Sequence, residues 1–351
     1  MLELKSKKLT ILLLFAWLCV EAVQAQIIQD RQPSSGPGGK DYQHQSYVSF
    51  DETAKEGDGY WMYTPAEPAP DSANVIVFLH GWAVTNPMVY GAWIKHMVGK
   101  GNIVIYPRYQ KRIFSTYPKH YAQNSADAIV AALKKLEEPG LVKPRIENII
   151  YAGHSYGAAI ASYFGVEYSK YNLPKPKGLL IAQPGTSPAK SCNLETYADM
   201  ESDIKLVVTV GHGDHIVGDL MAVKILNTAG AKDKNLLLHI SDGHGAPTIH
   251  SSHATPCAVA PEMDNGQRNY IITAAINRSD TDAVDYYCYW KLSDALSDCA
   301  FYGQNCDYVF GDTEKQRYMG TWSDGKQVKP ITVFMNVDPK EEKEKRRSKR
   351  R

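Results

Sequence analysis

The sequence constrains the fold most strongly at residues 148–161, which read NIIYAGHSYGAAIA. Residues 148–152 have the apolar and β-branched content of a buried strand, and a run typical of a helix begins at Ala158. The chain must therefore turn from strand to helix around a G-x-S-x-G motif centred on Ser155. In such a turn the serine takes a strained backbone conformation, and only glycine fits two residues to either side. The motif predicts that Ser155 is a nucleophile presented at the end of a strand.

Composition and the N-terminus indicate an exported globular protein. The 351 residues carry a net charge of +1 with 44% hydrophobic residues, enough for one α/β domain with an appendage, and nothing indicates nucleic-acid binding. Residues 1–25 have a basic start, an apolar run and small residues before a cleavage point. We expect a cleaved signal peptide and a secreted or periplasmic protein. An uncleaved anchor is the alternative, but the apolar run is shorter than the roughly 20 residues of a spanning helix, so we expect no stable membrane anchor.

Residues 56–262 have the pattern of a single α/β domain. Apolar runs that predict strands alternate with helical patterns; these runs are residues 60–65, 75–79, 102–106, 148–152, 178–182, 205–210 and 236–240. Helices are expected after Pro87, Ala158 and Leu220, and one capped by Ser125. This alternation predicts a mostly parallel sheet with helices on both faces and chemistry at the carboxyl ends of the strands. Only about twenty residues separate Gly185 from the strand at 205–210, so we expect no large cap domain.

The flanking regions differ in composition from the domain. Residues 26–55 are rich in Gly, Pro and Ser and predict a flexible N-terminal lead. Residues 263–337 are rich in aromatic residues and cysteine, and predict a partly helical C-terminal extension that packs on the domain or covers one end of it. Residues 338–351 are charged and predict a disordered tail. Export would leave five cysteines, enough for two disulfides; Cys299 and Cys306 are close enough to clip a loop, but the pairing stays open.

A nucleophilic serine needs a histidine base, and the histidine needs a carboxylate that fixes its tautomer. Asp214 lies four residues past the strand at 205–210 and is the expected acid, with Asp219 and Asp242 as alternatives.

The base is open between two histidines that follow the strand at 236–240. Position favours His244, which lies four residues after Ile240, in the loop that should face Ser155. His253 is the alternative, and His250 is the weakest of the three.

Acyl transfer at Ser155 would also need backbone N–H donors for the negative charge of the tetrahedral intermediate, each contributing about 3 to 4 kcal/mol. The expected donors of this oxyanion hole are Tyr156, which follows the nucleophile, and Trp82, in the loop after His80 and Gly81. We expect no metal and no cofactor, because the histidines beside Asp214 have no evident third ligand.

Three short segments resemble the α/β-hydrolase superfamily over residues 60–256: GHSYG at 153–157, HGW at 80–82 and SHATP at 252–256. The order Ser155, Asp214, histidine is the one that this superfamily uses. Within it, the chain is similar to secreted bacterial serine esterases near the dienelactone hydrolases, chlorophyllases and polyester hydrolases. The likeness of residues 252–256 to the polyester hydrolases implies His253 as the base.

These features lead to one main hypothesis and two alternatives. The main hypothesis is a secreted serine hydrolase that cleaves carboxylic esters, small or polymeric, through an acyl-enzyme. The alternatives are a peptidase or amidase of the same fold and a non-catalytic binding module on the same scaffold. The ester substrate and the oligomeric state stay open.

Overall fold

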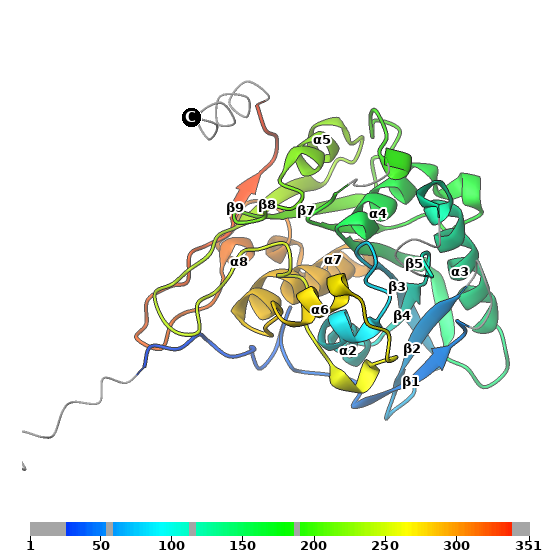
Figure 1. Ribbon diagram of the computed structural model, residues 1–351, viewed down its shortest axis with the longest axis horizontal. Coiled ribbons are helices and arrows are strands. Elements are labelled where there is room, and N and C mark those ends of the chain that lie inside the picture. The colour runs from blue at the N-terminus through cyan, green and yellow to red at the C-terminus, as the bar shows by residue number, and fades with distance from the viewer. Residues whose placement is uncertain (1–25, 54–58, 112–116, 186–189, 339–351) are drawn as a thin grey trace, which may run out of the picture.

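The computed structural model describes residues 26–53, 59–111, 117–185 and 190–338. The proposed signal peptide and nearly all of the charged tail lie outside these residues. A nine-stranded sheet crosses the molecule in the order β1-β2-β4-β3-β5-β6-β7-β8-β9 (Figure 1). Its strands are β1 (Ser46–Asp51), β2 (Tyr60–Ala66), β3 (Ser72–Leu79), β4 (Asn102–Pro107), β5 (Lys143–His154), β6 (Gly178–Ala182), β7 (Lys205–Gly211), β8 (Lys234–His239) and β9 (Thr332–Phe334).

The sheet is parallel from β4 through β3, β5, β6 and β7 to β8, and antiparallel at its edges, where β1, β2 and β9 pair. The expected mostly parallel α/β sheet is therefore confirmed. Each predicted strand matches an observed one, and β6 matches to the residue. The strand predicted as the last is followed by β9, which the C-terminal extension adds beside β8. No separate cap domain is present among the described residues.

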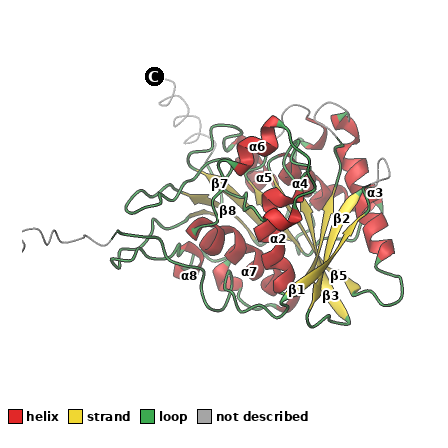
Figure 2. Ribbon diagram, turned by 60° about the horizontal axis from the view of Figure 1, so that its bottom comes forward, coloured by secondary structure: helices red, strands yellow, loops and turns green. Residues whose placement is uncertain are grey.

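Helices cover both faces of the sheet (Figure 2). One face packs against α3 (Tyr121–Lys135), α4 (Tyr156–Glu167) and α5 (Leu220–Thr228). The other packs against α2 (Gly91–Gly99), α6 (Tyr270–Ile276), the π-helix η6 (Asp285–Trp290) and α7 (Lys291–Tyr302). Successive strand side chains point to opposite faces, so Val77 joins the first core and Phe78 the second. Ser125, expected as a helix cap, is instead buried inside α3, which begins at Tyr121.

Short helices complete the chain between these elements. They are η1 (Pro87–Tyr90), η2 (Pro118–His120), η3 (Tyr168–Tyr171), η4 (Lys190–Cys192), η5 (Pro261–Met263), η7 (Cys306–Tyr308) and α8 (Glu314–Arg317). Cys299 and Cys306 form a disulfide that closes the loop after α7. The second disulfide that five cysteines would permit is not formed among the described residues, where Cys192, Cys257 and Cys288 are buried thiols.

The segment expected to be a flexible lead has fixed contacts in the structure. It first runs beside the C-terminal extension and then contributes β1 to the sheet (Figure 1). The backbone of Ile28 accepts a hydrogen bond from Ser323 N–H at 2.9 Å, and its own N–H donates to the Ser323 hydroxyl at 3.1 Å. Gln29 accepts from the Ala283 N–H at 3.0 Å. The composition of residues 26–55 did not predict these contacts, because the partners, Ser323 and Ala283, lie far away in the sequence.

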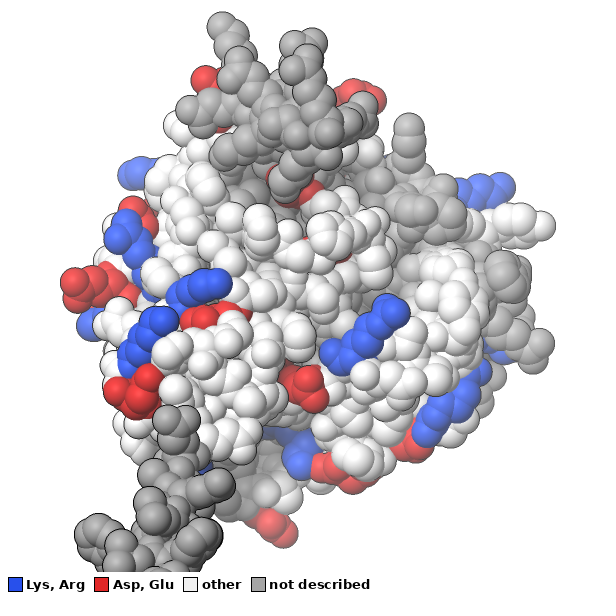
Figure 3. All heavy atoms as spheres, turned by 60° about the vertical axis from the view of Figure 1, so that its left-hand side comes forward, with Lys and Arg blue, Asp and Glu red and all other residues white. Residues whose placement is uncertain are grey.

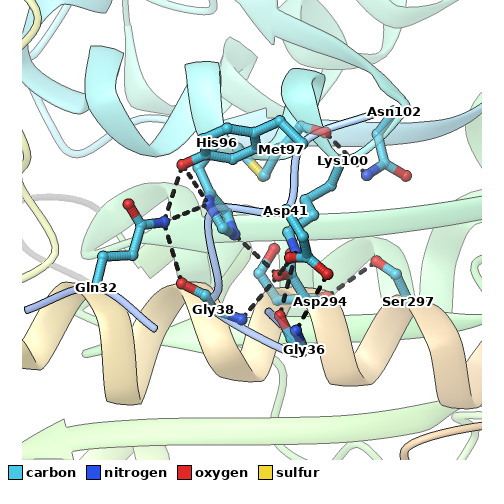
Figure 4. Close-up of polar contacts among 12 residues, drawn as sticks. Gln32, Gly36, Gly38, Asp41, His96, Met97, Lys100, Asn102, Asp294 and Ser297 are labelled. Atoms are coloured by element: carbon cyan, nitrogen blue, oxygen red, sulfur yellow. Dashed lines mark hydrogen bonds and ion pairs between the residues drawn. The ribbon is translucent and has the colours of Figure 1, made fainter. Parts of the chain in front are cut away.

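A buried polar cluster joins this N-terminal lead to α2 and α7 (Figure 4). Asp294 of α7 is 8% exposed and accepts hydrogen bonds from Gly38 N–H at 2.8 Å and from His96 of α2 at 2.9 Å. Lys100 lies 3.8 Å from the same carboxylate oxygen and pairs with Asp41 of the lead. Three segments that are distant in sequence therefore depend on one carboxylate.

Replacing Asp294 by alanine should lower the free energy of unfolding by about 3 kcal/mol, because the Gly38 N–H and His96 would lose a buried partner. Urea unfolding followed by circular dichroism measures this. Asp312→Ala is the matched control, since it breaks an ion pair with Arg317 in which both side chains are exposed; it should cost less than about 1 kcal/mol. Equal losses in the two variants would contradict the prediction.

The surface carries both signs of charge. On the face in Figure 3, basic and acidic side chains are interspersed, often as neighbours, without a continuous patch of either sign. Within the described ranges, no helix combines the length and apolarity that crossing a bilayer requires.

Candidate active site

Ser155 lies on a strained turn between β5 and α4. Its backbone has φ 56° and ψ −117°, a conformation rarely occupied by residues other than glycine. A Cβ on Gly153 would lie 2.4 Å from the Gly157 carbonyl oxygen, and one on Gly157 would lie 2.0 Å from the Leu79 carbonyl oxygen. Both glycines of the motif are therefore required by close backbone packing, as the sequence predicted.

Two further side chains form a hydrogen-bonded chain to this serine. His253 Nε2 lies 2.9 Å from Ser155 Oγ, and His253 Nδ1 lies 2.7 Å from Asp214 Oδ2. Asp214 comes from the loop after β7, and its second oxygen accepts the N–H groups of Ile216 and Val217 at 2.9 and 3.1 Å. Burial raises the pKa of Asp214, but the hydrogen bond and charge of His253 and these N–H groups outweigh it, so its pKa lies below the usual value. The carboxylate therefore stays ionised beside the imidazole.

His244, the histidine favoured by position, lies elsewhere. Its Nε2 is 2.7 Å from Asp324 Oδ2, and its Nδ1 is 3.2 Å from Lys326 Nζ, both in the C-terminal extension. The reason is a closed loop: the backbones of Asp242 and Ile249 pair with each other, with both hydrogen bonds at 2.9 Å. Residues 243–248, which include His244, form this loop, and the chain resumes beside Asp242 at Ile249. His253 follows four residues later.

The remaining alternatives are also placed away from Ser155. Asp242 accepts hydrogen bonds from the Trp322 indole and the Lys329 N–H, at 3.2 and 3.0 Å. Asp219 precedes α5, and His250 is exposed.

The segment 80–84, here called the oxyanion loop, lies against the nucleophile. A Cβ on Gly81 would be 3.5 Å from the Ser155 Cβ. The Gly81 N–H donates to the Tyr90 hydroxyl at 3.1 Å, and the Ala83 N–H donates to Gln110 Oε1 at 2.8 Å. The N–H of Trp82 lies between these two anchored groups.

Tyr156 directly follows Ser155 and occupies the first position of α4. The structure thus brings both sequence-predicted donor residues next to the serine.

Three buried histidines surround the site in the neutral form. Burial and the nearby His253 hold the pKa of His154 well below its usual value, and its Nδ1 lies 2.8 Å from the Tyr90 hydroxyl. Burial lowers the pKa of His80 and of His239 to about 4. His80 Nδ1 lies 2.7 Å from the Gly81 carbonyl oxygen, so the imidazole is bonded to the backbone of the oxyanion loop.

Acid should therefore destabilise the fold through His80 and His239. Between pH 6.5 and about 4 the unfolded chain binds protons at these residues that the folded chain excludes, so stability falls as the pH falls. At pH 5 each histidine should cost about 2 kcal/mol relative to pH 8. His239→Gln should reduce the difference between the unfolding free energies at pH 8 and pH 5 by about that amount in urea titrations. An unchanged difference would contradict this assignment.

Sequence reasoning missed several residues that support the site. Gln183 follows β6 in a left-handed conformation with φ 47° and is fully buried. Its amide lies 3.1 Å from the Tyr289 hydroxyl of η6, and Asn269 reaches the oxyanion loop. Gln183 could have been found from its position at the carboxyl end of a predicted strand. The sequence around Asn269 and Tyr289 gave no signal that they contact the site. Across the described ranges, no three His, Cys, Asp or Glu side chains are grouped as a metal site would need.

Comparisons with known proteins give one family match and one similar solved structure. Residues 57–210 match the family model described as Chlorophyllase. A solved structure of an esterase from Pyrobaculum calidifontis is similar at 12% identity and a TM-score of 0.45, covering 57% of this chain and 76% of that one. No curated protein matches the sequence. The chain is therefore similar, over residues 57–210, to the chlorophyllase family.

Proposed function

We propose that this protein is a secreted serine hydrolase of carboxylic esters. The observation that carries the proposal is the hydrogen-bonded chain from Asp214 through His253 to Ser155, on a strained strand-to-helix turn. The match to the chlorophyllase model supports ester hydrolysis as the reaction class. Export is inferred from residues 1–25, and the disulfide between Cys299 and Cys306 is compatible with it.

The residues perform acyl transfer as follows. His253 Nε2 takes the proton of the Ser155 hydroxyl as its oxygen bonds to the ester carbonyl carbon. Asp214 holds Nδ1 protonated and stabilises the imidazolium. The negative oxygen of the tetrahedral intermediate accepts hydrogen bonds from the N–H groups of Trp82 and Tyr156.

The intermediate collapses as the carbon–oxygen bond to the alcohol breaks and His253 gives that alcohol its proton. Water then attacks the acyl-enzyme by the same steps, releasing the acid and restoring Ser155. No metal or cofactor takes part. Because no cap domain covers the site among the described residues, we infer a substrate that is small or that presents a chain end or surface, as polymeric esters do.

The test is hydrolysis of p-nitrophenyl acetate and butyrate by the mature chain from Gln26, with Ser155→Ala beside it. We expect the variant to lose at least about 10³-fold in kcat while keeping its circular dichroism spectrum. A p-nitroanilide of the same acyl group is assayed in parallel. Faster turnover of the anilide would favour a peptidase or amidase, and no Ser155-dependent turnover of either substrate would favour a non-catalytic binding module.

A further inference from the structure

The C-terminal extension contacts the oxyanion loop through Asn269, the residue that caps α6. Its Oδ1 accepts the N–H groups of Ile271 and Ile272 at 2.8 and 2.9 Å, which fixes the orientation of the side-chain amide. Its Nδ2 then donates to the Ala83 carbonyl oxygen at 2.9 Å. Both the oxygen and the nitrogen of the Asn269 amide are hydrogen-bonded, and the bonds to α6 orient its N–H donor toward the oxyanion loop.

Ala83 is the residue of this loop that most needs support. Its φ of 64° lies in the left-handed region, which costs a residue with a Cβ about 1 kcal/mol or more. The Val84 N–H donates to the Gly81 carbonyl oxygen at 3.0 Å, so residues 81–84 form a tight turn with Trp82 and Ala83 at its centre. A turn with positive φ at its third residue relaxes when the central peptide flips. Gln110 holds the Ala83 N–H, which belongs to this central peptide, and Asn269 holds the Ala83 carbonyl of the following peptide. Together they fix the two peptides on either side of Ala83 and so stabilise the turn that carries Trp82.

The same extension reaches the segment of the proposed base through Tyr289. The Tyr289 hydroxyl accepts a hydrogen bond from Gln183 Nε2 at 3.1 Å and lies 2.9 Å from His239 Nε2. Gln183 Nε2 also donates to the Ser252 carbonyl oxygen at 3.0 Å. That carbonyl belongs to the peptide bond that joins Ser252 to His253. Its orientation therefore helps to fix the position of the His253 backbone, from which the imidazole side chain extends. Gln183 and Tyr289 are fully buried, so water does not compete for the hydrogen bond between them.

We propose that the C-terminal extension is a working part of the active site, in which Asn269 positions the oxyanion loop and Tyr289, through Gln183, positions His253. This inference rests on the proposed function of Ser155. Asn269 and Tyr289 are positioning residues, because neither contacts the reacting atoms. Both also lie beyond residue 210, where the match to the chlorophyllase model ends.

Three variants of the mature chain test the proposal. Asn269→Asp keeps an oxygen that caps α6 but loses the donor to Ala83, and Tyr289→Phe loses only a hydroxyl. Tyr302→Phe is the matched control: its hydroxyl also joins the extension to the sheet, at Asn74 near the start of β3, the edge opposite Ser155. For each we measure kcat and KM on p-nitrophenyl butyrate, inhibition by phenylboronic acid, and hydrogen exchange of peptides covering residues 80–86 and 250–257.

We expect Asn269→Asp to lower kcat by about 10- to 100-fold with KM within about threefold, to weaken phenylboronic acid inhibition, and to speed exchange in residues 80–86. Adding Ala83→Gly should recover part of the lost kcat, because glycine adopts the left-handed conformation without strain. Tyr289→Phe should lower kcat by about five- to tenfold and speed exchange in residues 250–257. Tyr302→Phe should change none of these.

The outcomes separate this inference from the proposed function. If the wild type hydrolyses the ester through Ser155 but the kcat of Asn269→Asp and of Tyr289→Phe equals that of Tyr302→Phe, the positioning role is overturned. A uniform loss that follows melting temperature in all three variants would overturn it as well. If the wild type shows no Ser155-dependent turnover, both the proposed function and the catalytic effect of Asn269 and Tyr289 are overturned. Hydrogen exchange would then still decide whether the extension holds the two loops.

Discussion

His253→Ala should lower kcat on p-nitrophenyl butyrate by about 10³-fold or more, whereas His244→Ala should stay within about twofold of wild type. The reason is geometric: of these two histidines, His253 is the one within hydrogen-bond distance of both Ser155 and Asp214. His244 is half-buried and bonded to Asp324 in the extension. Steady-state rates of the two variants at pH 8 measure the difference directly.

The His244 variant also serves as the control for folding, because it removes a histidine from the same segment of chain. Circular dichroism spectra and melting temperatures of both variants should resemble those of the wild type. A large loss of kcat in His244→Ala, with His253→Ala still active, would mean that the base has been assigned to the wrong residue.

Gly157→Ala should prevent formation of the native turn or lower the free energy of unfolding by about 3 kcal/mol or more, with loss of Ser155-dependent hydrolysis. A Cβ there would lie 2.0 Å from the Leu79 carbonyl oxygen and 2.4 Å from that of His80. These are backbone atoms of β3 and of the oxyanion loop, so no side chain can rotate away to make room. Soluble yield, urea unfolding and ester hydrolysis together measure the effect.

Gly243→Ala provides the comparison, since a Cβ at that position meets only the Thr248 side chain, at 3.8 and 3.9 Å. It should change the unfolding free energy by less than about 1 kcal/mol. A Gly157→Ala protein with wild-type stability and activity would show that the turn and β3 can move apart, against the close packing seen here.

The central fold could be predicted because its signals are local. The strand predicted at residues 178–182 is β6. Gly153 and Gly157 indicated a tight turn, and the structure has no room for a Cβ at either position. Asp214, the expected acid, could be placed for the same reason, since it follows β7 directly. Each of these assignments uses a few consecutive residues and the rule that parallel strands end at a common edge.

The position of the proposed base, and of the residues that contact its segment, depends on contacts that local patterns do not encode. Counting from β8 pointed to His244 because the loop closed by Asp242 and Ile249 cannot be recognised before the pairing is known. Resemblance to a known motif pointed to His253 where counting failed. Asn269 and Tyr289 meet the site only through tertiary packing, and their own neighbourhoods in the sequence resemble any aromatic or polar surface helix.

The contact between Ile28 and Ser323 has a consequence for the order in which the molecule can assemble. These residues lie 295 positions apart, so the segment around Ile28 is synthesised early and can dock only after the segment around Ser323 has been made. Asp294, which holds Gly38, and the extension that supports both loops of the site are also synthesised late. Contacts of such long sequence separation form slowly and only on a finished chain. The chain would thus gain the contacts of its N-terminal lead and those of Asn269 and Tyr289 around Ser155 together, in one late step after synthesis of the C-terminal extension.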